Sequence, residues 1–366
     1  MIHYFIPDMP TTDQLTPYLR EIDHNRWYSN FGPLFDKLKL SLAEKILNDI
    51  DPNRIVLVSS GTSAIELALK NLQLPTGSKI LTSSFTFPAT IEAILNVGLT
   101  PVICDIDKEN WQLTPAIAEQ AIFAQDFSAV VPVAAFGIPV CSENWSDFSN
   151  RTGLPVVVDA AAALINQEIS DTLIYAFSLH TTKPIGAGEG GLVVCPSKGQ
   201  ALQIQKMSNF GIEPDRIINQ VGTNAKLSEY HCAVGLANMQ RLTDTLSKRN
   251  QLFKYYTSLL TKRKLPLCLQ AGSEQYTPTS LYVVFDDASA DSVSSALFER
   301  SIETRRLYSP IINAHPAFEN IDVLDNSELV NALTIAENGL ALPFHMHLSH
   351  EEIEVIVNAL AEVLVS

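Results

Sequence analysis

The sequence contains no close pair of cysteines, no apolar run long enough to cross a membrane and no dense cluster of basic residues. Its five cysteines are scattered and have no CxxC spacing, which argues against a disulfide framework or a zinc ribbon and favours a reducing compartment. No stretch approaches 18 consecutive apolar residues, so no transmembrane helix is expected. The first ten residues lack the basic flank and apolar run of a signal peptide. We therefore expect a cytoplasmic protein.

Acidic residues outnumber basic ones by 40 to 25, which gives a formal net charge of −15 at pH 7. Nucleic acids and anionic lipids are bound by clustered Lys and Arg, and the longest basic run here is Lys262-Arg263-Lys264. We therefore expect neither nucleic acid nor membrane as a partner. With 366 residues, of which 46% are hydrophobic, the chain is long enough for about two domains with buried cores.

Short apolar runs alternate with amphipathic stretches through the first half of the chain. Between the first two runs, Ile65, Ala68, Leu69 and Leu72 recur at helical spacing. This alternation predicts an α/β fold in which helices cover both faces of a mostly parallel sheet. The predicted strands are residues 54–58, 80–82, 100–106, 129–136, 154–158, 172–179 and 191–195.

The character of the sequence changes near residue 240. A long helix is predicted over residues 236–260, a strand over 280–285 and a closing helix over 349–364. Ser349 and Glu352 have the spacing of a capping box, which marks the start of the closing helix.

Three parts of the chain are predicted from these patterns. Residues 1–33 show little periodicity and are expected to form an arm on the main body. Residues 34–240 would form a large domain. Residues 241–366 would form a smaller C-terminal α+β domain with the long helix at its start.

Ligands of a parallel sheet bind beyond the carboxyl ends of its strands, and three places there carry candidate groups. Ser59-Ser60-Gly61-Thr62-Ser63 separates a strand from a helix, where hydroxyls and N–H groups favour an anion such as phosphate. Asp159 follows an apolar run and would be partly desolvated. Lys183 lies between two strands beside a glycine-rich turn, where crowding lowers a lysine pKa toward the nucleophilic amine. The alternatives are two ordinary helix caps and an exposed loop lysine.

A phosphate-binding helix start, a carboxylate and an amine are together the parts that hold pyridoxal 5′-phosphate (PLP). In that arrangement Lys183 forms the covalent link, Asp159 keeps the pyridine nitrogen protonated and the helix start takes the phosphate. The glycine-rich turn leads into a strand and does not open a helix. A dinucleotide-binding loop is therefore not expected.

The chain resembles the DegT/DnrJ/EryC1/StrS family of sugar aminotransferases, which are fold-type I PLP enzymes. The likeness extends over nearly the whole length and rests on short strings in the family's order. These are Trp27–Pro33, Gly61–Ala64, Ser84–Phe87, Asp159–Ala161, Ser178–Lys183, Gly188–Gly191, the GxNxRxSE-like Gly222–Glu229, and Thr304–Arg306 with Tyr308, Pro310, His315 and Pro316.

The resemblance implies roles for individual residues. Lys183 would be the cofactor-linked lysine and proton shuttle, Asp159 would pair with the pyridinium nitrogen, and Phe87 would stack on the ring. The family's homodimers share active sites, so Asn224 or Lys226 would reach the partner's cofactor phosphate. Thr62 and Ser63, with Gly61 before them, and Ser178 would hold the phosphate. Trp27, Tyr28, Asn30, Arg305, Tyr308 and His315 would lie toward the sugar nucleotide, although packing of the arm and small domain is an equal alternative for these six.

Two positions bear on the reaction. Family members usually carry Gln or His where this chain has Ala162, which leaves that edge of the cofactor ring to His180 or a water. Dehydrase relatives replace the cofactor-linked lysine with histidine, whereas residue 183 is Lys. The resemblance therefore favours amino transfer.

The resemblance implies transfer of an amino group from L-glutamate, leaving 2-oxoglutarate, to a nucleotide-linked keto sugar. The favoured acceptor is a dTDP-4-keto-6-deoxy hexose aminated at C4 or C3, and the product an amino sugar for a polysaccharide or natural product. The alternatives are a non-catalytic PLP-fold regulator and a PLP enzyme of other amino-acid chemistry. A metal site is not expected, because His345 and His347 have no Cys or Glu at ligand spacing.

Overall fold

The centre of the molecule is a mostly parallel β-sheet. The computed structural model describes residues 1–213, 215–324 and 328–365. Two groups of strands, ordered β1-β7-β6-β5 and β4-β2-β3-β10, are joined by single parallel bridges from Val130 to Val156 and from Val133 to Asp159. Only β7 runs antiparallel to its described neighbours. The strands are β1 (Ile55–Val58), β2 (Lys79–Ser83), β3 (Thr100–Cys104), β4 (Ala129–Val131), β5 (Val157–Asp159), β6 (Ile174–Ser178), β7 (Gly191–Val194) and β10 (Asp322–Val323).

Helices cover both faces of this sheet, which is why its strands are apolar on both sides. Alternate residues of one strand enter different cores: Ile55 and Leu57 of β1 pack on one face, and Val56 and Val58 on the other. One face is covered by α2 (Pro33–Lys45), α5 (Pro115–Ala124), α6 (Ser142–Thr152) and α8 (Glu229–Gln240), and the other by α3 (Gly61–Lys70), α4 (Pro88–Asn96) and α7 (Lys198–Met207). The predicted α/β class is confirmed.

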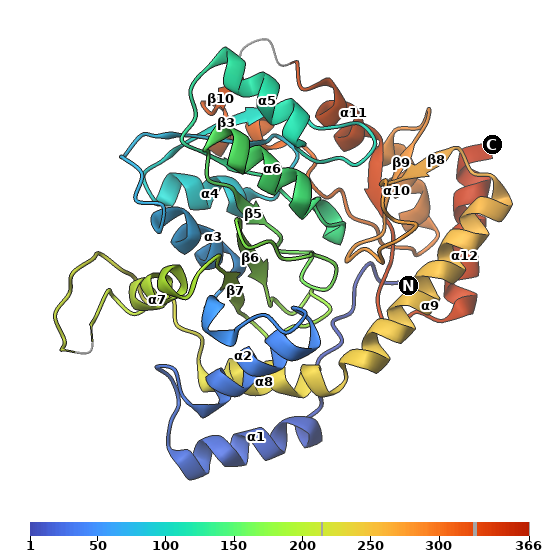
Figure 1. Cartoon of the computed structure of the whole chain (residues 1–366). Helices are drawn as coiled ribbons and strands as arrows, with labels where there is room; N and C mark the ends of the chain where they lie inside the picture. The colour runs from blue at the N-terminus through green and yellow to red at the C-terminus, as the bar shows by residue number, and fades with distance from the viewer. Residues whose placement is uncertain (214, 325–327, 366) are drawn as a thin grey trace.

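A smaller antiparallel sheet lies beside the main body, at the right of Figure 1. Its strands, in the order β11-β9-β8, are β8 (Leu267–Leu269), β9 (Tyr282–Phe285) and β11 (Gly339–Ala341), and it packs with α9 (Leu242–Arg263), α10 (Ala290–Glu299) and α12 (His350–Val365) around a core of its own. α11 (Val330–Asn338) contributes Ala332 and Ile335 to a further core that includes β9. The capping box is formed, since Ser349 N–H donates to Glu352 and Glu352 N–H donates to the Ser349 hydroxyl.

The predicted single helix over residues 236–260 is wrong, because the chain forms two helices that meet at Arg241. Arg241 ends α8 and precedes α9, and its guanidinium forms a 2.6 Å ion pair with Asp8. Neither Gly nor Pro marks the break. The strand predicted over residues 129–136 is also too long: it ends at Val131, and Phe136 has a positive φ of 55°.

The N-terminal arm is more ordered than its weak periodicity predicts. It contains α1 (Thr12–Asn25), which packs on α8. Its first residues instead contact the smaller sheet's unit, where Ile2 pairs with Ile302. In the other direction, β10 from the C-terminal part pairs with β3 of the main sheet. The division into parts at residues 33/34 and 240/241 stays a prediction, and contacts cross both boundaries.

A buried carboxylate joins two of the sequence strings. Glu229, at the start of α8, accepts hydrogen bonds from the N–H groups of Leu34 and Phe35 at 2.8 and 2.9 Å, and so caps α2. A Cβ on Gly32 would lie 2.7 Å from Cδ of Glu229. Burial raises the pKa of Glu229, while the two N–H donors lower it. The close approach of α2 to α8 therefore depends on both Gly32 and Glu229.

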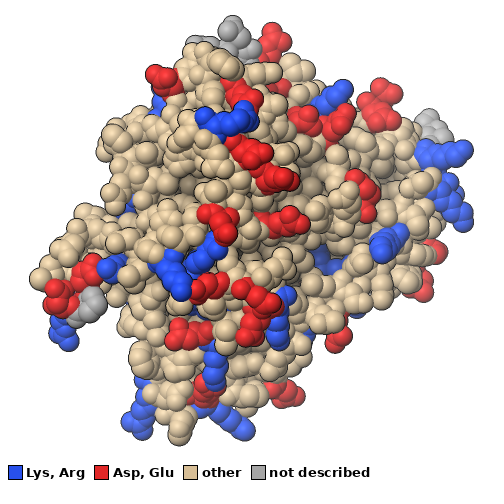
Figure 2. Space-filling view, in the orientation of Figure 1, with Lys and Arg blue, Asp and Glu red and all other residues tan. Residues whose placement is uncertain are grey.

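In the face shown in Figure 2, Lys and Arg are interspersed with Asp and Glu and form no continuous basic patch. No helix among the described residues has the length and apolar character needed to span a membrane. Within the same residues, no group of three or more His, Cys, Asp or Glu is placed to hold a metal ion.

Candidate active site

Asp159 and Lys183 both lie at the carboxyl edge of the main sheet, near enough for their charges to interact. Asp159 ends β5 and is buried, whereas Lys183 lies in the loop between β6 and β7 and is half-buried. Burial raises the pKa of Asp159, and the charge of Lys183 opposes this rise. Burial likewise lowers the pKa of Lys183, and Asp159 opposes that fall. Each group thus acts on the other, and the lysine is shifted toward the neutral amine that nucleophilic and base catalysis require.

The Asp159 carboxylate is held by two donors. The hydroxyl of Thr90, on α4, donates to Oδ2 at 2.6 Å, and the N–H of Ala161 donates to Oδ1 at 3.1 Å. The hydroxyl of Thr86 lies 2.7 Å from that of Thr90. Thr90 carries no signal in the sequence, because a buried Thr on an amphipathic helix does not by itself indicate a functional residue.

A helix start lies against the end of β6, at the corner where an anion-binding site is predicted. Ser60 caps α3 by accepting the N–H of Ser63 at 3.0 Å, which leaves the first N–H groups of the helix for a ligand. A Cβ on Gly61 would lie 2.9 Å from Cβ of Ser178, the last residue of β6. Gly61, Thr62, Ser63 and Ser178 therefore come together, as predicted for residues that hold a phosphate.

Phe87 and His180 flank this edge differently. Phe87 is the residue before α4, and its side chain is 59% exposed, so its ring is free to stack on a ligand. The ring nitrogens of His180 face side chains of its own loop: Nδ1 lies 2.9 Å from the Thr182 hydroxyl and Nε2 lies 3.7 Å from Glu189. Both positions are compatible with their predicted places, which stay predictions.

Ala162, where the resemblance leads one to expect Gln or His, contacts Thr279 in the loop that precedes β9. Its carbonyl accepts the hydroxyl of Thr279 at 2.6 Å. Thr279 is held in turn by Arg249, whose guanidinium donates to the carbonyl of Pro278 at 2.8 Å and to that of Thr279 at 3.3 Å. The turn after Asp159 is therefore joined to the smaller unit by hydrogen bonds from side chains to main-chain carbonyls.

Of the residues predicted on the substrate side, Tyr308 lies nearest the candidate chemistry. Its ring stacks on Phe136 with 4.9 Å between centroids and meets Phe85 edge-on at 5.1 Å. Burial raises its pKa, and the neighbouring charge of Asp159 adds to the rise. Tyr308 therefore stays a neutral hydroxyl close to Asp159.

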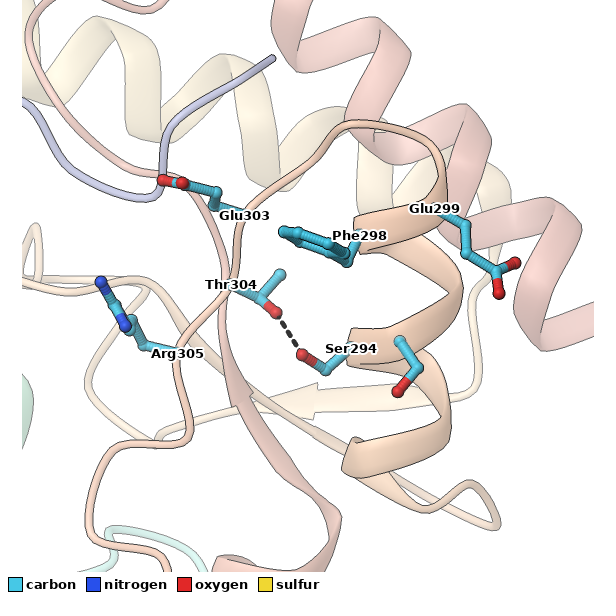
Figure 3. Close-up of a pocket in the computed structure, with 7 residues that line it drawn as sticks. Ser294, Phe298, Glu299, Glu303, Thr304 and Arg305 are labelled. Carbon is cyan, nitrogen blue, oxygen red and sulfur yellow. Dashed lines mark hydrogen bonds between the residues drawn. The ribbon is translucent and has the colours of Figure 1, made fainter.

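Arg305 and His315 lie away from these groups. Arg305 lines a surface hollow of about 480 Å³ between α10 and residues 303–305, and Figure 3 shows its side chain pointing away from the hydrogen-bonded Ser294 and Thr304. Within residues 1–213, 215–324 and 328–365, no hydrogen bond or ring contact joins Arg305 or His315 to Asp159 or Lys183.

The N-terminal string forms a partly exposed aromatic surface. The indole N–H of Trp27 donates to the carbonyl of Ser29 at 2.5 Å, and the ring of Tyr28 stacks on Tyr230 with centroids 6.2 Å apart. Asn30 follows with a positive φ of 61°. This surface adjoins the start of α8, because the N–H of Glu229 donates to the carbonyl of Tyr28.

Asn224 and Lys226 form a pair beside β1. The Lys226 ammonium donates to Oδ1 of Asn224 at 2.6 Å and lies 4.9 Å from the Phe210 ring centroid. The backbone of Lys226 forms a bridge with Val58, at the end of β1. In the chain, the pair follows a long loop that begins after α7 and projects at the left of Figure 1.

Comparisons with known proteins agree over nearly the whole chain. A model of the DegT/DnrJ/EryC1/StrS aminotransferase family matches residues 11–361. The chain is 29% identical to dTDP-4-amino-4,6-dideoxy-D-glucose transaminase of Shigella dysenteriae, over 98% of this chain and 97% of that relative. Its fold is similar to that of a Bacillus cereus ATCC 10987 protein assigned as a PLP-dependent aminotransferase, with a TM-score of 0.91 and 28% identity over 98% of this chain and 99% of that one. It is also similar to DesI, solved in the presence of its TDP-sugar product, with a TM-score of 0.86 and 25% identity over 97% of this chain and 91% of that one.

Replacing Gly61 by Ala is predicted to weaken PLP binding by about tenfold or more, the weight of one lost hydrogen bond to a charged group. The added Cβ would lie 2.9 Å from Ser178 and must separate the start of α3 from the end of β6. Absorbance titration of the cofactor-free protein gives the dissociation constant. Gly199→Ala is the matched control, because Gly199 also follows a serine cap but its Cβ would meet nothing closer than 3.8 Å. Equal affinities of the two variants would contradict the prediction.

The amine of Lys183 is predicted to become reactive at a lower pH than an exposed lysine. Burial lowers its pKa and Asp159 opposes the fall, so Asp159→Asn should move the midpoint to a still lower pH. The measurement is brief acetylation of the cofactor-free protein across a pH series, with each lysine followed by peptide mass spectrometry. The exposed Lys108 is the internal reference and should not respond to the substitution. A midpoint for Lys183 that does not move, or moves upward, would show that the two groups do not interact.

Proposed function

Because the chain belongs to the DegT/DnrJ/EryC1/StrS aminotransferase family, we propose that it moves the amino group of L-glutamate to the ketone carbon of a nucleotide-linked keto sugar. The chain is thus a PLP-dependent aminotransferase, and the sugar acceptor and the donor are the proposed parts. The observation that supports the proposal is that Lys183, Asp159 and the α3 start all lie at the carboxyl edge of the sheet, where the charges of Lys183 and Asp159 act on each other.

The residues at this edge fit the cofactor. A buried carboxylate held by two donors suits a protonated ring nitrogen. The first N–H groups of α3, with the hydroxyls of Thr62, Ser63 and Ser178, suit a phosphate. Lys183 supplies the amine that would hold the cofactor's aldehyde, and Phe87 offers an exposed ring to stack on its plane.

PLP, when bound, carries the amino group between the two half-reactions and accepts the electron pair left when a substrate carbon loses its proton. The protein's share of the work is to bind, orient and move protons. Lys183, with its pKa lowered by burial, takes the proton from the donor's α-carbon and later delivers one to the sugar carbon. Asp159 would hold the positive charge on the ring nitrogen. Glutamate and keto sugar are thereby converted to 2-oxoglutarate and amino sugar, with no other reactant consumed.

The acceptor is proposed from the relatives. Two curated relatives, from Shigella dysenteriae and Escherichia coli, are each named dTDP-4-amino-4,6-dideoxy-D-glucose transaminase and are 29% identical to this chain. DesI was solved with a TDP-sugar product. These names favour a dTDP-linked 4-keto-6-deoxy hexose, and C4 over C3 as the aminated carbon. The product would be an amino sugar for a polysaccharide or natural product, made in the cytoplasm, in keeping with five free cysteines.

Aromatic residues are proposed to receive the sugar nucleotide. Tyr308 is placed to contact the sugar, because its neutral hydroxyl lies near Asp159. The exposed rings of Trp27 and Tyr28 offer faces for a base or sugar. Arg305 and His315 would take part only at the outer end of an extended ligand, since they have no described contact with the central pair.

We also propose that two copies of the chain form a homodimer with shared sites. The loop between α7 and Asn224 carries several apolar side chains that are exposed to solvent in a single copy of the chain. These are Phe210, Ile212, Ile217, Ile218 and Val221, the last of them 76% exposed. A second copy would cover them. Asn224 and Lys226 of one copy would then lie toward the predicted anion-binding corner of the other.

The proposed reaction predicts activity with L-glutamate and dTDP-4-keto-6-deoxyglucose, detected as a dTDP-amino sugar by mass spectrometry and located at C4 by NMR. Lys183→Ala should lower kcat by at least about 10⁴-fold, since proton transfer by a positioned base contributes 10²–10⁴-fold and the covalent attachment is lost as well. The control is Lys198→Ala, on the surface at the start of α7. Amination of a 3-keto isomer alone would move the proposal to C3. Consumption of glutamate without any keto-sugar acceptor would favour other amino-acid chemistry.

The proposed dimer predicts that Val221→Asp raises the dimer dissociation constant by about tenfold or more, because a carboxylate would be buried in an apolar contact. Sedimentation velocity across a concentration series measures it. Phe123→Asp, on α5, is the control, since Phe123 is also an exposed apolar residue. In addition, mixed dimers of Lys183→Ala and Lys226→Ala subunits should recover activity that neither variant has alone. A monomeric wild-type protein, or no recovery in mixed dimers, would rule out shared sites.

A further inference from the structure

Two buried hydroxyls form a chain behind the Asp159 carboxylate. Thr90 Oγ1 lies 2.6 Å from Oδ2 of Asp159, and Thr86 Oγ1 lies 2.7 Å from Thr90 Oγ1. The exposures of Thr86, Thr90 and Asp159 are 2%, 0% and 4%. Water therefore does not compete for these groups, and each bond is stronger than it would be at the surface.

The chemistry of the groups gives this chain one direction. An ionised carboxylate can only accept, so the Thr90 hydroxyl must donate to Asp159. Having used its one proton, Thr90 can only accept from Thr86, whose hydroxyl must then donate. Successive bonds in one direction polarise one another, so the hydroxyl that faces the carboxylate becomes a better donor.

We propose that Thr90, supported by Thr86, is a positioning residue for the amino transfer, which fixes the Asp159 carboxylate in one orientation and stabilises its charged form. The inference rests on the proposed function, in which Asp159 meets the ring nitrogen of the cofactor. The hydroxyl pair does not touch the reacting carbons and acts through Asp159.

Among the described groups around the carboxylate, Thr90 is the side chain that holds it by a hydrogen bond. Oδ1 has the main-chain N–H of Ala161 at 3.1 Å, and Thr90 is the one described side chain that donates to either oxygen. Burial raises the pKa of Asp159, and the bond from Thr90 is the largest influence that lowers it, ahead of Ala161 and Lys183. Lys183 and Tyr308 are the titratable neighbours that interact with the carboxylate.

The same two threonines lie on either side of the first residues of α4. Phe87 precedes α4, so Thr86 and Thr90 lie on either side of it along the chain, one helical turn apart. The bond between their hydroxyls closes that turn. The two hydroxyls therefore connect the start of α4 to the Asp159 carboxylate.

The test is the binding of pyridoxamine 5′-phosphate to cofactor-free protein across a pH series, because this form makes no covalent bond to Lys183. Thr90→Val keeps the shape and removes the hydroxyl, and it should weaken binding by about tenfold or more. Without its donor the pKa of Asp159 rises, so the acidic limb of the affinity profile should move to higher pH. Thr90→Ser should restore both values, and Thr86→Val should show the same changes in smaller size.

Thr82→Val is the matched control. Thr82 is also fully buried in the main sheet, and its hydroxyl donates to the carbonyl of Val131 at 2.7 Å, away from Asp159. Its loss should leave the affinity and the acidic limb unchanged. Thermal unfolding of each cofactor-free variant checks that it is folded, and if Thr90→Val does not fold, the smaller shift in Thr86→Val decides.

The outcomes separate the inference from the proposed function. A folded Thr90→Val protein with wild-type affinity and an unmoved acidic limb would overturn the positioning role and leave the aminotransferase intact. An Asp159→Asn protein that binds as tightly as wild type, or a wild-type protein that binds neither PLP nor pyridoxamine 5′-phosphate, would remove the proposed function itself and the inference with it.

Discussion

The carboxylate of Asp159 lies out of contact with water at the end of β5, and an ionised group in such a place needs donors or an opposite charge. The fold supplies them from three directions: the Thr90 hydroxyl from α4, the N–H of Ala161 from the following turn, and Lys183 from the loop after β6. Meeting that requirement holds α4, β5 and the lysine loop in one arrangement. Burial in this arrangement lowers the pKa of the lysine amine, and the donors and the lysine oppose the rise that burial causes in the pKa of Asp159.

Close backbone approaches determine where the rest of the site lies. Gly61 brings the start of α3 against Ser178, so that an anion-binding helix end and the end of β6 share one corner. Gly32 brings α2 against the buried Glu229 and places the aromatic surface of Trp27 and Tyr28 beside α8. In both cases a side chain larger than hydrogen would separate two elements that carry predicted functional groups. The close packing at these glycines therefore also determines the positions of those groups.

The smaller unit is tied to the site through main-chain groups. Arg249 is buried on α9, stacks over Phe344 at 4.8 Å and holds the carbonyls of residues 278 and 279, while Thr279 bonds to Ala162 beside Asp159. At position 162 the resemblance leads one to expect Gln or His. This chain has Ala there, and the carbonyl of Ala162 accepts a hydrogen bond from Thr279.

Local patterns in the sequence determined the order of strands and helices, and with it the positions at and just after the strand ends, where Gly61, Asp159, Ser178 and Lys183 lie. Alternation and buried runs report these features because they depend on neighbours within a few residues. Tertiary structure alone decided that Thr90 meets Asp159, 69 residues away, that β7 runs antiparallel, and that the long helix breaks at Arg241 where its side chain reaches Asp8. Such contacts depend on how distant segments pack, and no periodicity in one segment carries that information.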